Sequence, residues 1–121
     1  MPKKILIADD DDNIRELIQF TLEDEGYEIH MAKNGKEAEK IALEIKPDLI
    51  ILDVMMPEKT GYEVCEELRK NPETAKSYVL FLSARGSPVA EKTGKIKGGN
   101  EFLVKPFDPE ILRRKINDII K

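Results

Sequence analysis

The chain has 121 residues, enough for one hydrophobic core and too few for two, so we expect a single domain over residues 1–121. With 40% apolar and 36% charged residues it has the composition of a soluble globular protein, and its net charge of −4 argues against a basic surface for direct nucleic-acid binding. It lacks an apolar run near the roughly 20 residues that cross a membrane, and its one cysteine permits no internal disulfide, so we expect a cytoplasmic protein without membrane contact.

Short apolar runs alternate along the chain with segments whose apolar residues recur every three or four positions. In chain order, the runs predict strands at residues 4–8, 27–31, 48–52, 78–82 and 101–104. The segments between and after them predict helices with apolar faces over 14–22, 38–45 and 61–68, a helix somewhere in 88–97, and a last one over 112–120. The first, third and fourth strands are apolar almost throughout, which is typical of parallel strands buried on both faces.

The ends of these helices are marked with unequal clarity. Asp12 or Asn13 is the expected N-cap of the first helix, and Asp108-Pro109 supplies a cap and a first-turn proline for the last. The segment 93–95 has low helix propensity and no clear apolar stripe, so the fourth helix is poorly specified.

Five strand–helix units in series predict an α/β domain with a five-stranded parallel sheet and helices on both faces. The expected strand order is 2-1-3-4-5, as in flavodoxin-like folds of the (βα)5 kind. In such sheets ligands bind beyond the C-terminal strand ends, where strands 1 and 3 are neighbours.

Acidic residues gather at that point of the predicted sheet. The first strand runs into four aspartates, and Asp53 ends the third, so Asp9, Asp10 and Asp53 should converge. Two carboxylates about 4 Å apart repel by roughly 4 kcal/mol at an effective dielectric of 20, which calls for a cation. Oxygen ligands without histidine or cysteine favour a hard divalent ion, and Mg²⁺ suits a site that handles phosphate. We interpret Asp11 and Asp12 more simply, as residues that cap the first helix.

Two further polar residues lie at predicted strand ends. Ser83 ends the fourth strand and Lys105 ends the fifth. A hydroxyl and an ammonium that face a carboxylate cluster are suitable partners for a phosphoryl group, whose oxygen charges must be neutralised. Each residue alone would be unremarkable, and their joint placement carries the interpretation.

These residues together resemble the receiver domain of two-component response regulators, of the chemotaxis-regulator type. The resemblance rests on the Asp9-Asp10 pair, LIILDVMMP around Asp53, LSA at 82–84 and VKPF at 104–107. It covers essentially the whole chain in the family's order and spacing.

The resemblance implies roles for the acidic site. Asp53 would accept a phosphoryl group from a histidine kinase or a histidine phosphotransfer protein. Mg²⁺ would be held by the side chains of Asp10 and Asp53 and by the backbone carbonyl of Met55, with Asp9 acting through water. Lys105 would pair with the acceptor carboxylate and then with the phosphoryl group. The protein would be a phosphoacceptor that assists its own phosphorylation and dephosphorylation, and not an enzyme.

The resemblance also implies a switch. The Ser83 hydroxyl would follow the phosphoryl group, Phe102 would turn inward, and the surface of the fourth helix, fifth strand and fifth helix would signal to a downstream effector protein or domain. It further implies a cis peptide bond at Lys105–Pro106. The chain departs from the family's usual pattern at Thr60-Gly61 and in the loop 97–100.

Two other functions fit the sequence less well. A metal-dependent phosphatase with an aspartate nucleophile would have Asp-x-Asp, but the second residue after Asp53 is Met55. A binding module that is never phosphorylated would be expected to lack part of the acid–serine–lysine set. We interpret His30 as a surface residue, Cys65 as core, and the pair Met55-Met56 as packed in its loop.

Overall fold

The computed structural model describes residues 2–121, in which strands and helices alternate. The strands are β1 (Lys4–Ala8), β2 (Glu28–Ala32), β3 (Leu49–Asp53), β4 (Tyr78–Ser83) and β5 (Glu101–Val104). The α-helices are α1 (Asp12–Leu22), α2 (Gly35–Ile45), α3 (Gly61–Lys70), α4 (Pro88–Ile96) and α5 (Pro109–Ile120). A 3₁₀ turn, η1 (Glu23–Glu25), which the sequence did not predict, follows α1. The bounds of β1 and β5 are as predicted, whereas β2 and β3 each begin and end one residue later.

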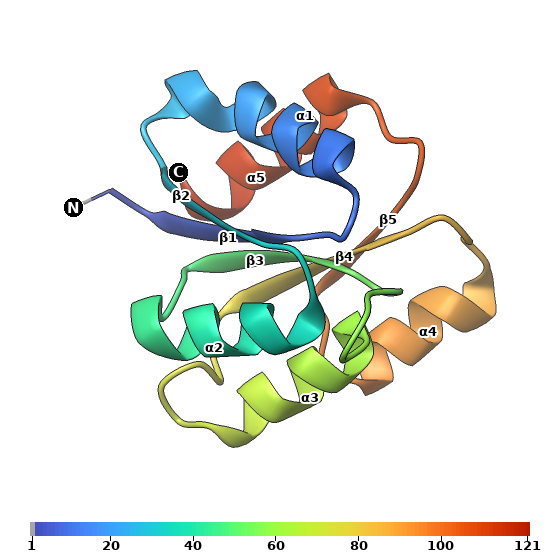
Figure 1. Ribbon diagram of the computed structural model, residues 1–121. Helices are drawn as coiled ribbons and strands as arrows, with labels where there is room; N and C mark the ends of the chain where they lie inside the picture. The colour runs from blue at the N-terminus through green and yellow to red at the C-terminus, as the bar shows by residue number, and fades with distance from the viewer. Residues whose placement is uncertain (1) are drawn as a thin grey trace.

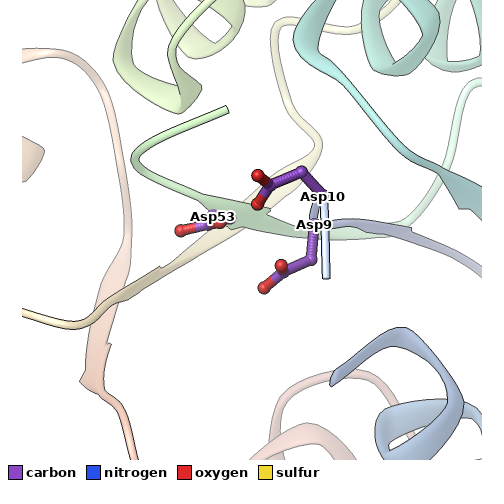
Figure 2. Close-up of side chains that lie close together, drawn as sticks. All are labelled: Asp9, Asp10 and Asp53. Carbon is purple, nitrogen blue, oxygen red and sulfur yellow. The ribbon is translucent and has the colours of Figure 1, made fainter. Parts of the chain in front are cut away.

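The five strands form one parallel sheet in the order β2-β1-β3-β4-β5, which confirms the predicted topology. Helices α1 and α5 cover one face, and α2, α3 and α4 cover the other (Figure 1). Because β1 pairs with β3, the C-terminal ends of these two strands lie side by side, with Asp9 and Asp10 next to Asp53 (Figure 2).

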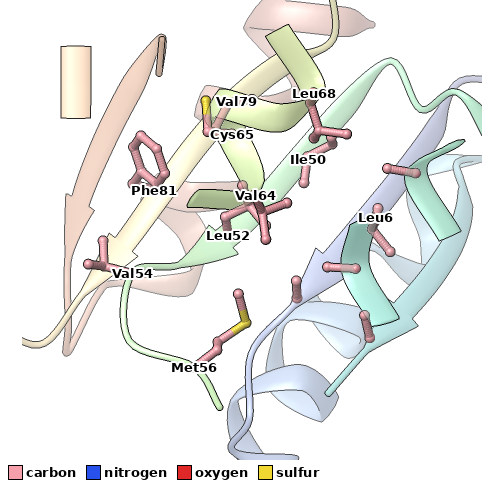
Figure 3. Close-up of a cluster of buried hydrophobic side chains, with 14 residues drawn as sticks. Leu6, Ile50, Leu52, Val54, Met56, Val64, Cys65, Leu68, Val79 and Phe81 are labelled. Carbon is pink, nitrogen blue, oxygen red and sulfur yellow. The ribbon is translucent and has the colours of Figure 1, made fainter. Parts of the chain in front are cut away.

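Alternate residues of the central strands feed two separate hydrophobic cores, one on each face of the sheet. Leu6, Ile50, Leu52 and Phe81 point into the core shared with α2 and α3, where they are fully buried (Figure 3). Cys65 lies in the same core with no exposed surface, as predicted. The intervening strand residues pack against α1 and α5. Burial on both faces explains why β1, β3 and β4 are apolar almost throughout.

The N-cap prediction for the first helix is wrong by one or two residues. The cap is Asp11, which has extended backbone angles and accepts a hydrogen bond from the Asn13 N–H at 2.8 Å. Its own N–H donates to Asp9 Oδ1 at 2.9 Å, so the chain turns into the helix earlier than Asp12 would allow. The prediction for the last helix is confirmed, with Asp108 as its cap.

The loop before β5, where the sequence departs from the family's pattern, is tied to α3 and β4. Arg69 Nε donates to the Gly98 carbonyl at 2.9 Å, and Arg69 Nη2 donates to Asn100 Oδ1 at 2.9 Å. The same Asn100 oxygen accepts the Val79 N–H at 2.9 Å. These bonds fix the end of α4 to the sheet.

Candidate functional site

Three aspartates meet at the C-terminal ends of β1 and β3. One carboxylate oxygen from each of Asp9, Asp10 and Asp53 lies within 4.8 Å of the others (Figure 2). Asp9 and Asp53 are buried, and Asp10 is exposed. The convergence expected from the strand order is therefore present.

Asp9 is held in place by the start of α1. Its Oδ1 accepts the Asp11 N–H, and its backbone carbonyl accepts a hydrogen bond from Arg15 Nη1 at 2.6 Å. Its Oδ2 is buried and faces the ammonium of Lys105. Sequence reasoning missed Arg15; its signal is a cation one turn into the helix that follows the aspartates.

Lys105 bridges the two buried acids from the end of β5. Its Nζ lies 2.7 Å from Asp9 Oδ2 and 3.4 Å from Asp53 Oδ2. The following peptide bond, Lys105–Pro106, is cis, as the resemblance implies. The ammonium thus lies between the two buried carboxylates of the cluster.

The surroundings of the cluster shift the pKa values of Asp53 and Lys105. Burial, and then the negative charge of Asp9, raise the pKa of Asp53 from 3.8 to about 7, although Lys105 opposes the shift. Burial by itself would lower the pKa of Lys105, but its hydrogen bond to Asp9 and the charges of Asp9 and Asp53 raise it above the usual lysine value. The site therefore holds more negative charge than one lysine neutralises.

Ser83 lies near the acids but does not contact them. Its hydroxyl donates to the Arg85 carbonyl at 3.0 Å and accepts the Arg85 N–H at 3.1 Å. It lines a cavity of about 340 Å³ together with Asp53, Lys105 and Tyr62. Tyr62 was not predicted to be near the site; it directly follows Gly61, which approaches the end of β3.

The loop after Asp53 is held by backbone contacts. The Gly61 N–H donates to the Val54 carbonyl at 2.8 Å, and a Cβ on Gly61 would lie 2.4 Å from the Asp53 carbonyl oxygen, so only glycine fits. Thr60 caps α3 through a reciprocal pair of hydrogen bonds with Glu63. The departure from the family's pattern at Thr60 thus leaves the helix start well capped.

Met55 and Met56 differ from each other. Met56 is buried in the core of Figure 3, but the Met55 side chain is 70% exposed, so the prediction that both pack in the loop is wrong for Met55. Met56 belongs to the core that also contains Ala38 and Ala42 of α2, whereas Met55 lies outside it. The Met55 N–H points at Asp53 Oδ1 over 3.4 Å.

Phe102 lies away from the acids, on β5. It is half-buried and packs against the core on the α2–α3 face of the sheet. It also lines a cavity of about 160 Å³ between α4 and β5, bordered by Gly94 and Gly99.

The acidic cluster fits a hard divalent cation. Its donors are carboxylate oxygens from three residues, and histidine and cysteine are absent from the group found in residues 2–121. The raised pKa of Asp53, which remains even with Lys105 beside it, indicates negative charge that a further cation would relieve.

Comparison with known proteins places this geometry in a family. The family model described as the response regulator receiver domain matches residues 5–117. The chain belongs to the response regulator receiver family. This receiver domain is similar to chemotaxis response regulator CheY4 of Vibrio cholerae, with 36% identity, a TM-score of 0.93, and coverage of 99% of this chain and 100% of that one.

Two longer relatives match the whole of this receiver domain. The alkaline phosphatase synthesis transcriptional regulatory protein PhoP of Bacillus subtilis is 38% identical over 121 residues. The DNA-binding dual master transcriptional regulator RpaA of Synechocystis is 37% identical over 121 residues. The chain spans about half the length of these relatives, 50% of each. The match identifies a receiver domain of a two-component response regulator, a class of protein consistent with phosphorylation-dependent signalling.

Proposed function

We propose that this receiver domain accepts one phosphoryl group on Asp53 from a phosphohistidine of a histidine kinase or a histidine phosphotransfer protein. The observation that carries the proposal is the position of Lys105, whose ammonium contacts both Asp9 and Asp53 at the strand ends. A nucleophilic carboxylate with a fixed cation beside it suits phosphoryl transfer, which needs mainly positioning and neutralised charge.

The transfer forms a bond between an Asp53 carboxylate oxygen and phosphorus as the bond from phosphorus to the donor's imidazole nitrogen breaks. The bonding electron pair leaves with that nitrogen, which takes a proton. Lys105 lies beside the attacking carboxylate and can pair with a phosphoryl oxygen once Asp53 is esterified. Mg²⁺ bound by Asp9, Asp10, Asp53 and the Met55 carbonyl would neutralise phosphoryl oxygen charge. In this proposal the domain is not an enzyme, although its own residues assist phosphorylation and dephosphorylation.

The response to phosphorylation begins at Ser83. Its hydroxyl now bonds within its own loop and shares a cavity with Asp53, so it can turn to a phosphoryl oxygen when the loop moves. Phe102 then moves inward, and the surface of α4, β5 and α5 changes for a downstream effector protein or domain. Phe102 has no hydroxyl, so this step works through packing alone.

The proposal also covers where the domain works and which molecules it contacts. None of the helices in residues 2–121 is both long enough and apolar enough to cross a bilayer. We place the domain in the cytoplasm, where a kinase can reach it, and assign it no direct contact with nucleic acid because its net charge is −4. Contacts with DNA would belong to other parts of a longer regulator.

Intact-mass measurement tests the proposal. Incubation with acetyl phosphate and Mg²⁺ should add one phosphoryl group to the parent and none to Asp53→Asn. The control Asp24→Asn changes an exposed aspartate in η1 and should be modified like the parent. An undiminished mass gain in Asp53→Asn would place the acceptor elsewhere.

A further inference from the structure

Helix α4 packs on the sheet through its backbone and not through large side chains. Its one buried residue is Gly94, whereas Val89 and Ile96 are 75% and 73% exposed. A Cβ on Gly94 would lie 3.1 Å from the Phe81 ring and 3.4 Å from the Phe102 ring. The helix backbone therefore rests directly on aromatic rings of β4 and β5, and no large side chain of α4 anchors it in the core.

Tyr62, from the first turn of α3, makes a polar contact with α4. Its hydroxyl donates to the Ala90 carbonyl over 3.4 Å, longer than the roughly 2.8 Å usual for a hydroxyl donor. Its ring meets the Phe81 ring edge-on, with centroids 5.1 Å apart and an interplanar angle of 73°. The ring is thus fixed by packing, while the hydrogen bond is weak enough to break when α4 shifts.

Ala90 is also where the loop from the candidate acceptor site meets the helix. The Ser83 hydroxyl is bonded to Arg85, and the same loop continues to Ser87, the N-cap of α4. Ser87 Oγ accepts the Ala90 N–H at 3.0 Å. One end of this residue is therefore held by the loop and the other by Tyr62.

The space around this junction permits movement. The cavity of about 340 Å³ that contains Asp53 and Ser83 extends to Tyr62 and Ala90. When Ser83 gives up its bonds to Arg85, the loop can move into this space. The backbone at the start of α3 is held in place, because Gly61, which precedes Tyr62, is packed against the backbone of Asp53.

We propose that Tyr62 is the residue through which the acceptor site controls α4. Its hydrogen bond to Ala90 holds the first turn of α4 in the unphosphorylated position, and the movement of Ser83 toward a phosphoryl group breaks that bond. This assignment rests on the proposed phosphorylation of Asp53. It adds a specific contact between Tyr62 of α3, which lies outside the α4–β5–α5 surface, and Ala90 of α4. That contact sets the balance between the unphosphorylated and phosphorylated positions of α4.

Hydrogen exchange on a single-atom variant tests the assignment. Without a phosphoryl mimic, Tyr62→Phe should raise amide exchange in residues 88–97 by about two- to three-fold, the effect of losing a hydrogen bond at the weak end of the usual range. Tyr78→Phe removes a hydroxyl at the opposite end of β4 and should leave these rates unchanged. After beryllofluoride and Mg²⁺ are added, Tyr62→Phe and the parent should exchange at equal rates, because the bond is already broken in both.

Fluorine NMR supplies an independent measurement. The chain has three tyrosines, so labelling with 3-fluorotyrosine gives three fluorine resonances, which Tyr→Phe variants assign. Beryllofluoride should shift the Tyr62 signal clearly more than those of Tyr27 and Tyr78. The assignment is overturned if exchange in 88–97 is the same in Tyr62→Phe and the parent without the mimic, or if their difference persists with it. A protein that shows no mass gain with acetyl phosphate would instead overturn the proposed function.

Discussion

Replacing Asp53 with asparagine should stabilise the metal-free protein, against the usual destabilising effect of changing a buried residue. Asp53 is 5% exposed, and its pKa is raised from 3.8 to about 7 by burial and by the charge of Asp9. At about 1.4 kcal/mol per pKa unit, ionised Asp53 lowers the free energy of unfolding by about 4 kcal/mol at pH 8. Asparagine keeps the shape of the side chain and removes this charge.

The pH dependence gives the prediction its sign. A carboxyl whose pKa is higher in the folded state than in the unfolded state imposes no penalty below the unfolded value, and the penalty is complete above the folded value. It therefore grows between pH 4 and pH 7, from about 2 kcal/mol at pH 5 to about 4 kcal/mol at pH 8. The stability advantage of Asp53→Asn should widen by about 2–3 kcal/mol between those two conditions.

Urea unfolding in EDTA at pH 5 and pH 8 measures this difference. Asp24→Asn is the matched control, since it removes the charge of an exposed aspartate, and its difference from the parent should stay nearly constant. The reasoning fails if Asp53→Asn is less stable than the parent at pH 8, or if its advantage does not change with pH.

The same charges lead to two more expectations. Lys105→Met should lower the free energy of unfolding in EDTA at pH 8 by about 3 kcal/mol, because two buried carboxylates lose their cation. The same variant should be phosphorylated more slowly by acetyl phosphate. If both values match the parent, Lys105 has no role in the cluster. Since Mg²⁺ must displace a proton from Asp53 below pH 7, its apparent Kd by calorimetry should fall about ten-fold from pH 6 to pH 8, whereas a pH-independent Kd would contradict the raised pKa.

The sheet could be predicted because its signals are local and strong. The runs that became β1, β3 and β4 are buried on both faces, so their composition alone separates them from helices. The N-cap of α1 could not be placed, because four consecutive aspartates offer equivalent caps. The choice of Asp11 depends on a contact with Asp9 that exists only after the chain has turned.

The candidate site was also predictable only in part. Strand order brings Asp9, Asp10 and Asp53 together, and that order follows from topology, so the cluster was predictable. The bonds that orient its members were not, because Arg15 reaches a backbone carbonyl and Tyr62 contacts a helix 28 positions away. The sequence signals Arg15 only by its place one turn into the helix that follows the aspartates, and the contact of Tyr62 leaves no pattern in the sequence.

The weak pattern of residues 88–97 has a physical meaning that the structure supplies. An amphipathic helix normally carries the bulk of its own packing, but in α4 the bulk comes from Phe81 and Phe102, and Gly94 only makes room for it. The position of such a helix depends on the rings beneath it. In the proposed response, a change in the Phe102 rotamer would alter the surface on which α4 rests, and the contact between Tyr62 and Ala90 would set how far the helix follows. A segment that looks like a poor helix in the sequence is, for this reason, well suited to the movement proposed for α4.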